Sequence, residues 1–270
     1  MTPGGLSLAV ASWGEEGVPA VAAHATGFCK ELWEPVIRRA RRPWRVVAPD
    51  QRGHGDSGTP PLPLDWWDLG RDLLAVVDQT ALEDPVGLGH SSGAAALAMA
   101  ELLRPGTFRA LVLVEPIVFP PPYFRAEGNP MSAAALRRRA SFPSPQAARA
   151  TFRGRGAFRH WTEEVLALYA THGLGLHDGA WALKCTPEVE AEFYRGATAH
   201  GAWERLGEVA CPVLLVGGAD SDSHPAPFLD AIRRCFASAR LEVVPGVGHF
   251  LPMDQPGAVA GLLDSVWPGD

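Results

Sequence analysis

The run Gly89-His90-Ser91-Ser92-Gly93 has the composition of a nucleophilic serine held on a tight turn. It fits the pattern G-x-S-x-G between a predicted strand and a predicted helix, which is the context that a nucleophile elbow requires. Glycines flank such a turn because side chains there would clash with the neighbouring elements. We therefore predict that Ser91 is the nucleophile and that Ser92, by its spacing, is not.

A dinucleotide-binding loop is the alternative interpretation of these glycines. In Gly87-Leu88-Gly89-His90-Ser91-Ser92, however, Ser92 stands where that fingerprint has its third glycine, and no Walker lysine follows. The run also follows the third or fourth predicted strand rather than the first. We therefore expect no nucleotide here, and no cofactor elsewhere.

A serine needs a base that takes its proton and a group that orients the base. Gly246-Val247-Gly248-His249-Phe250 lies after the last predicted strand, in a glycine-rich loop before the final helix. We predict His249 as the base, and we expect His54 and His90 to support loops. No pair of histidines has a pattern that supports a metal site, so no metal is expected.

The acid is expected at the end of the strand that precedes Gly217-Gly218-Ala219-Asp220-Ser221-Asp222. Asp220 fits if the turn is counted from Gly217, and Asp222 fits if it is counted from Gly218. We favour Asp220, with Asp222 as the alternative. Glu115, which closes the preceding predicted strand, is a third candidate. Whichever carboxylate serves would hold the imidazole tautomer and stabilise the imidazolium.

Short apolar segments alternate with longer helical ones, which predicts an α/β fold with a mostly parallel sheet and helices on both faces. An additional edge strand is expected near Leu6–Ser12. The other predicted strands are Val18–Ala23, Arg45–Pro49, Pro85–Gly89, Ala110–Glu115, Pro212–Gly217 and Leu241–Val244. The predicted helices are Glu31–Arg42, Trp66–Gln79, Gly93–Leu103, Pro225–Phe236 and Pro256–Val266.

One stretch interrupts this alternation. Residues 116–208 show no buried strand and predict helices joined by loops rich in proline and glycine. We interpret this stretch as a helical cap, or lid, inserted into a core of residues 1–115 and 209–270. An ordinary second subdomain with its own aromatic core is the alternative. The stretch includes Arg137-Arg138-Arg139, which indicates either a solvated helix face or a site for an anionic substrate.

Composition excludes several classes of protein. With 47% hydrophobic residues and a net charge of −6, the chain of 270 residues should pack a core and is a poor candidate for binding nucleic acid. No apolar run is long enough to span a membrane, and Met1–Ala11 lacks the pattern of a signal peptide. We therefore expect a cytoplasmic protein. The sequence leaves the oligomeric state open.

Four cysteines are scattered without a C-x-x-C pair, which predicts buried small side chains rather than a zinc site or a redox dithiol. They are Cys29, Cys185, Cys211 and Cys235.

Taken together, the chain resembles the α/β-hydrolase superfamily over nearly its whole length, in its branch with a serine nucleophile. The resemblance rests on four features: the run 24–28 (HATGF), the run 50–57 (DQRGHGDS), the elbow at Ser91, and His249. The run 50–57 is similar to a loop that is structural in the family. The resemblance implies that the backbone N–H groups of Thr26 and Ser92 form an oxyanion hole. Because Ala25 replaces the family's usual glycine, the choice among the amides of residues 26–28 stays open.

The sequence thus predicts a serine hydrolase that cleaves an ester, lactone or thioester with an apolar portion through an acyl-enzyme on Ser91. A serine at the elbow argues against haloalkane dehalogenases and epoxide hydrolases, which use aspartate there. A C–C bond hydrolase, a cofactor-free perhydrolase or an acyltransferase would use the same three residues. The alternative from another class is a non-catalytic protein that binds a small ligand on the same fold.

Overall fold

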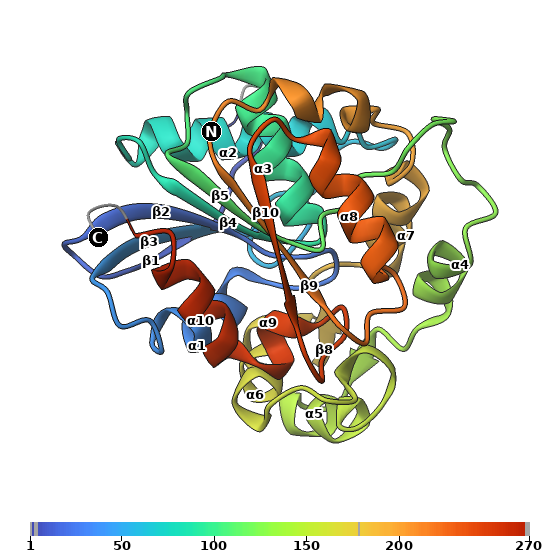
Figure 1. The fold of residues 1–270 in the computed structure, drawn as a ribbon. Coiled ribbons are helices and arrows are strands. Elements are labelled where there is room, and N and C mark those ends of the chain that lie inside the picture. The colour runs from blue at the N-terminus through green and yellow to red at the C-terminus, as the bar shows by residue number, and fades with distance from the viewer. Residues whose placement is uncertain (1, 3–4, 178, 268–270) are drawn as a thin grey trace.

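A seven-stranded sheet forms the centre of the molecule in the computed structural model, which describes residues 2, 5–177 and 179–267 (Figure 1). Its strand order is β1-β3-β2-β4-β5-β9-β10, and all neighbouring pairs are parallel except β1 and β3. The strands are β1 (Val10–Trp13), β2 (Val18–Ala23), β3 (Trp44–Pro49), β4 (Val86–His90), β5 (Ala110–Val114), β9 (Val213–Gly218) and β10 (Ala239–Val244). Parallel strands bring their carboxyl ends, and the loops that follow them, to one edge of the sheet.

Helices cover both faces of this sheet. One face packs against α2 (Trp67–Gln79), α3 (Ser92–Leu103) and α8 (Ala226–Cys235). The other packs against η1 (Lys30–Trp33), α1 (Glu34–Ile37) and α10 (Pro256–Asp264), with α9 (Leu251–Asp254) just before α10. Successive residues of a strand alternate between the two cores: Leu111 and Leu113 face the first, and Val112 and Val114 face the second. The predicted layered α/β fold is confirmed.

Most predicted elements occur within one or two residues of their expected bounds. The edge strand is present as β1, paired antiparallel with β3. The clearest difference is the predicted helix Glu31–Arg42, which is only a short turn, η1, followed by α1 and a loop. Pro35 lies at the start of α1, where proline is tolerated because its missing N–H would have had no helical partner.

The segment 116–208 contains helices and also a small antiparallel sheet. Its helices are α4 (Pro130–Arg137), α5 (Pro145–Phe152), η2 (Gly156–Phe158), α6 (Glu163–His172), α7 (Pro187–Gly196) and η3 (Ala202–Glu208). Its strands are β6 (Ser141–Phe142), β7 (Leu174–His177) and β8 (Ala180–Leu183), in the order β6-β8-β7. The expectation of helices and loops alone is therefore wrong for these strands. They have only two to four residues each and are poorly buried, unlike the buried strands of the main sheet.

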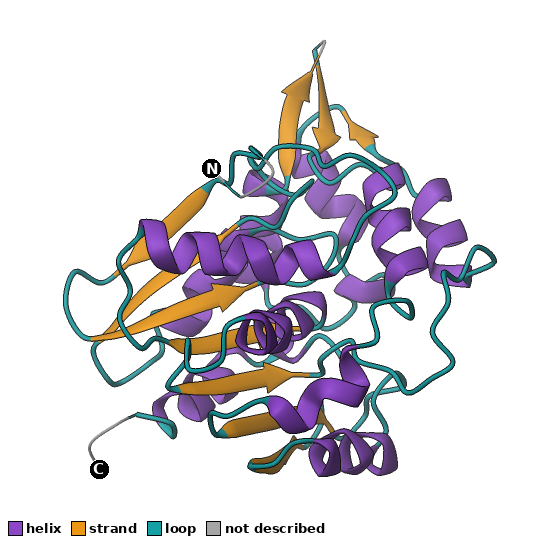
Figure 2. Cartoon of the chain, turned by 90° about the horizontal axis from the view of Figure 1, so that it is seen from above, coloured by secondary structure: helices purple, strands orange, loops and turns teal. Residues whose placement is uncertain are grey.

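The helices α4 to α7 gather beyond the end of the main sheet to which its strand arrows point (Figure 2), whereas η3 packs against α3 and α8. The predicted division into a core (1–115 and 209–270) and a cap (116–208) includes residues that lie outside the described part of the chain. These are residues 1, 3–4 and 268–270 in the core and residue 178 in the cap. Among the described residues, none of the helices has the length and apolar character needed to cross a membrane.

Candidate active site

Ser91 sits at a sharp turn between β4 and α3. Its backbone has φ 55° and ψ −115°, a strained conformation for a residue with a side chain. Gly89 and Gly93 permit this turn: a Cβ atom on Gly89 would lie 2.6 Å from the Cα of Ala94. Turns of this kind present the serine side chain above the carboxyl edge of the sheet.

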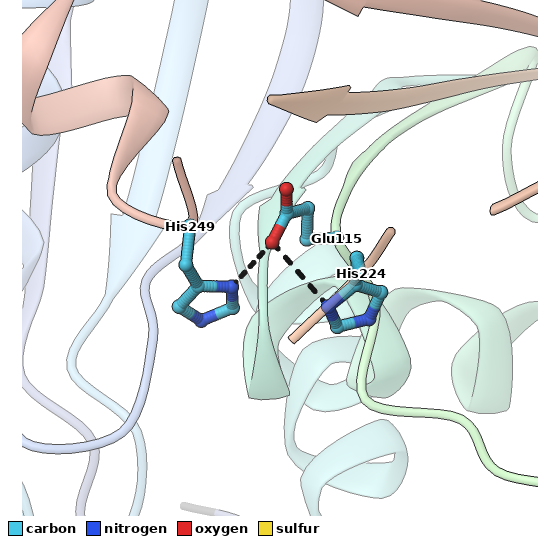
Figure 3. Close-up of side chains that lie close together, drawn as sticks. All are labelled: Glu115, His224 and His249. Carbon is cyan, nitrogen blue, oxygen red and sulfur yellow. Dashed lines mark hydrogen bonds and ion pairs between the residues drawn. The ribbon is translucent and has the colours of Figure 1, made fainter. Parts of the chain in front are cut away.

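His249 lies between Ser91 and Glu115. Its Nε2 is 3.2 Å from the Oγ of Ser91. Its Nδ1 is 2.6 Å from Oε2 of Glu115, the contact drawn in Figure 3. Nδ1 can therefore donate its proton to the carboxylate, which leaves the lone pair of Nε2 directed at the serine hydroxyl. This arrangement has the geometry of an activated serine nucleophile.

The carboxylate beside His249 is not the one favoured from the sequence. Asp220 and Asp222 are both exposed, and in the part of the chain that the structure describes neither side chain bonds to His249. The expected placement of Asp220, or of its alternative Asp222, against His249 is therefore wrong. The backbone of Asp220 is used instead: its N–H donates to the carbonyl of Val247, which ties the two loops together.

The sheet explains why Glu115 reaches His249. β5, which ends just before Glu115, is the direct neighbour of β4, which leads to Ser91, whereas β9 lies one strand further away. Glu115 adopts a positive φ of 44° at the carboxyl edge of the sheet. The sequence could therefore name Glu115 only as a candidate, because the folded sheet decides which strand lies next to the elbow strand.

The loop after β9 holds Glu115. The backbone N–H of Gly218 donates to Oε1 at 2.9 Å, and the hydroxyl of Ser221 donates to Oε2 at 2.8 Å. Complete burial of Glu115 would by itself raise the pKa of this carboxyl. The interactions with His224 and His249 outweigh burial and hold the pKa well below its usual range. The structure therefore keeps Glu115 ionised beside His249.

A second loop, after β2, lies beside the elbow. The N–H of Gly27 donates to Nε2 of His54 at 2.8 Å, and the N–H of Phe28 donates to the carbonyl of Ala25. Among the described residues, the N–H of Thr26 makes no hydrogen bond, and that of Ser92, in the first turn of α3, has no helical partner. The hydroxyl of Ser92 accepts a hydrogen bond from Gln51, which engages it away from the nucleophile position.

Buried histidines support these loops, as expected for His54 and His90. His54 can accept from Gly27 while its other nitrogen donates to the carbonyl of Arg52, and Nε2 of His90 lies 2.8 Å from the carbonyl of His249. Burial lowers the pKa of His54 and of His90 to about 3. Both rings are therefore neutral when the loops are in place.

This burial makes stability depend on pH. Desolvation lowers the pKa of His24 and of His200 to about 4, so four histidines are neutral in the folded protein but titrate near 6.5 when unfolded. Their stabilising contribution is present above about pH 6.5 and is lost as the pH falls, because the unfolded chain then binds more protons. We expect the free energy of unfolding to fall by about 1 kcal/mol per histidine between about pH 6.5 and 5.5. Urea unfolding at several pH values measures this loss in the free energy of unfolding. In His200→Gln the free energy of unfolding should depend less on pH. Equal stability of the wild type across this range would contradict the prediction.

Tyr169 of α6 connects the segment 116–208 to the loop after β2. Its hydroxyl donates to the carbonyl of Gly27 at 3.0 Å and lies 3.3 Å from Nη2 of Arg138. Arg138 also pairs with Glu190 of α7, while a Cβ on Gly27 would lie 3.2 Å from Oε1 of Glu190. The middle arginine of the run 137–139 therefore points inward rather than forming part of a solvated face.

An aromatic cluster adjoins the same loop and His249. Its members, which pack edge to face or tilted against one another, are Phe28, Trp161, Tyr169 and Phe250. The ring of Phe250 lies 5.2 Å from that of His249, measured between centroids. Apolar surface therefore borders the reactive groups.

Three of the residues at the site also have side chains that could bind a metal ion. The ligand atoms of Glu115, His224 and His249 lie within 4.8 Å of one another. The short contact of Nδ1 of His249 with Glu115 is that of a charge-assisted hydrogen bond, and such contacts account for this cluster without an ion. His224 was not singled out from the sequence as a functional residue.

Comparison with known proteins agrees with this geometry. Residues 20–262 match the model of the alpha/beta hydrolase family. A non-heme chloroperoxidase of Streptomyces lividans is 26% identical over 94% of each chain, and a 2-(acetamidomethylene)succinate hydrolase of Mesorhizobium japonicum is 25% identical over 83% of this chain and 79% of its own. The crystal structure of an E-2-(acetamidomethylene)succinate hydrolase superposes with a TM-score of 0.86 at 23% identity, covering 97% of this chain and 96% of the other. The thioesterase domain of the curacin biosynthetic pathway gives 0.82 at 22% identity, with 97% of both chains covered. The chain thus belongs to the alpha/beta hydrolase family.

Proposed function

We propose that this protein is a serine hydrolase that cleaves an ester-like bond (carboxylic ester, lactone or thioester) through an acyl-enzyme on Ser91. The observation that carries the proposal is the alignment of Ser91, His249 and Glu115 through contacts of 3.2 Å and 2.6 Å. Family relatives named as hydrolases, among them the one from Mesorhizobium japonicum, support it.

In the first half of the reaction, the Oγ of Ser91 attacks the carbonyl carbon while its proton passes to Nε2 of His249. The carbonyl oxygen becomes an oxyanion, and the free N–H groups of Thr26 and Ser92 are proposed to stabilise it. Each such donor contributes on the order of 3 kcal/mol in reactions of this type. When the intermediate collapses, His249 returns the proton to the leaving alcohol or thiol, and the acyl group remains on Ser91.

In the second half, water attacks the acyl-enzyme and gives its proton to His249. The acid then leaves, and Ser91 recovers its proton. Glu115 stays ionised throughout; it fixes the tautomer of His249 and stabilises the imidazolium that forms in each half.

We also propose that residues 116–208 act as a cap that forms part of the substrate pocket. The aromatic side chains Trp161 and Tyr169 come from this segment and lie against Phe28 and Phe250 near His249. A small-molecule substrate with an apolar portion fits such a border, because burying apolar surface favours binding.

Labelling with a fluorophosphonate probe tests the assignment, because the probe phosphonylates only an activated serine. The wild type should be labelled, and Ser91→Ala should not. Ser92→Ala, which changes the neighbouring hydroxyl held by Gln51, is the matched control and should retain labelling. Equal labelling of the wild type and Ser91→Ala would refute the proposal.

A peroxide is a second acceptor for the same acyl group. The relative from Streptomyces lividans, which aligns over 94% of this chain, is named a non-heme chloroperoxidase. Partition of one acyl donor between water, an alcohol and hydrogen peroxide distinguishes hydrolysis from acyl transfer and perhydrolysis.

Removing the hydroxyl of Tyr169 should slow the reaction. Tyr169→Phe leaves the carbonyl of Gly27 without its donor and loosens the loop that carries the Thr26 amide. We expect a fall of about tenfold in the rate of probe labelling, the equivalent of one lost buried hydrogen bond. The control is Tyr194→Phe, because Tyr194 bonds Glu190 and not the loop. Equal rates for Tyr169→Phe and the wild type would show that the hydroxyl does not hold the loop.

A further inference from the structure

Glu115 is shared by two histidines. One is His249; the other is His224, from the loop between β9 and α8, whose Nδ1 lies 3.3 Å from the same oxygen, Oε2 (Figure 3). The loop that was expected to carry the acid thus surrounds the acid instead. The backbone N–H of His224 donates to the hydroxyl of Ser221, which in turn donates to Glu115.

Nε2 of His224 faces an oxygen that can only accept, and Nδ1 faces both a carboxylate and a hydroxyl. Nε2 lies 3.1 Å from the carbonyl of Pro116, and Nδ1 faces the carboxylate. A proton on Nδ1 can be donated to the carboxylate, whereas Nδ1 without a proton can only accept, as from the hydroxyl of Ser223. The hydroxyl of Ser223, 3.0 Å from Nδ1, is the other donor within reach. Because the ring is completely buried, no bulk water competes for these positions.

The two histidines compete for one negative charge. Their rings stack at 13° with centroids 5.7 Å apart, so charge on one acts on the other through a short and mostly dry path. Of the remaining rings, His90, which packs on His249, is neutral. Phe250, which packs on His249, and Phe228, which packs on His224, are apolar. The hydroxyls of Ser221 and Ser223 complete the surroundings of Oε2. His224 is therefore the second imidazole beside the carboxylate of Glu115.

We propose that His224 is a positioning residue that acts through Glu115. It donates from Nδ1 to Oε2, fixes the carboxylate against His249 and takes up part of its charge. That charge would otherwise stabilise a protonated His249, which cannot act as a base. The inference rests on the proposed function, because it assigns His224 a role in the same site.

His224→Gln is the decisive variant. The side-chain amide of glutamine can still donate to the carbonyl of Pro116, but it does not supply the Nδ1 donor to Glu115. With the whole carboxylate left to His249, the midpoint of the acid limb in the pH profile of fluorophosphonate labelling should rise by about one pH unit. A midpoint unchanged from the wild type would overturn the inference, even if the labelling rate falls at every pH.

Two further variants separate positioning from packing. His224→Asn places an uncharged N–H donor near the position of Nδ1. The midpoint of its acid limb should therefore rise less than that of His224→Gln. His200→Gln removes another buried histidine, one that bonds the carbonyl of Ile117 and the N–H of Ala202 rather than Glu115, and should leave the midpoint unchanged. A shift in His200→Gln as large as that in His224→Gln would mean that general loss of packing moves the midpoint.

Nuclear magnetic resonance of the wild type keeps the inference separate from the proposed function. If the wild type is not labelled, the serine hydrolase proposal fails, but the protons on His224 can still be observed. Long-range spectra of protein labelled with nitrogen-15 on histidine should show a proton on Nδ1 of His224. An Nδ1 without a proton would overturn the inference, and this result requires no variant to fold.

Discussion

Replacing Glu115 by glutamine should lower turnover by about four orders of magnitude while the protein stays folded. Oε1 of Glu115 accepts the N–H of Gly218, so the amide oxygen of the glutamine will take that position. Its NH₂ group then faces Nδ1 of His249, where the carboxylate had accepted a proton. His249 must accept there and carry its proton on Nε2, toward Ser91. In that tautomer it cannot take the proton of the serine hydroxyl.

The measurement is the rate of fluorophosphonate labelling together with turnover of a panel of p-nitrophenyl esters. Asp220→Asn is the matched control, because Asp220 is exposed and contacts the neighbouring loop through its backbone. It should stay within about twofold of the wild type, as expected for a surface substitution. If Asp220→Asn were the inactive variant and Glu115→Gln the active one, the acid would come from the loop after β9.

The sequence predicted the fold well because buried parallel strands are short apolar runs with sharp ends. The runs 110–115 and 212–217 are of this type, and both correspond closely to strands β5 and β9. The same logic failed for β6 to β8, most of whose residues are half-buried or exposed. β7 and β8 pair with each other from adjacent stretches of the chain, and β6 joins β8 from a distant one. What shapes such short strands is their pairing partners more than their own residues.

Ser91 and His249 could be predicted because the turns that hold them leave glycines in the sequence. The acid leaves no such pattern. Glu115 and Asp220 both follow a strand of the same sheet, and what separates them is which strand lies next to β4. Strand order is a property of the folded chain, so the sequence could only name the candidates. The directions of the side chains in the loop after β9 then decide which of them lie in the site. Ser221 and His224 turn inward, while Asp220 and Asp222 turn to solvent.

Gly93→Ala should have the largest effect on stability of the substitutions considered. A Cβ atom at this position would lie 2.2 Å from the carbonyl oxygen of Ala23 and 2.5 Å from that of His24. These are backbone atoms of β2 and of the loop that follows it, so they cannot rotate away as a side chain could. α3 would have to move off the sheet and carry Ser91 with it. We expect a loss of about 3 kcal/mol in the free energy of unfolding, at the upper end for overpacking.

Urea unfolding of Gly93→Ala beside Gly261→Ala separates the steric effect from the general effect of adding a methyl group to a helix. Gly261 lies inside α10, and a Cβ there would meet no atom within 4 Å. Alanine is the better helix former, so this variant should gain about 0.5–1 kcal/mol. The two variants should therefore differ in sign. A Gly93→Ala protein as stable as the wild type would mean that α3 does not approach β2 this closely. The narrow turn would then not be what fixes Ser91 beside His249.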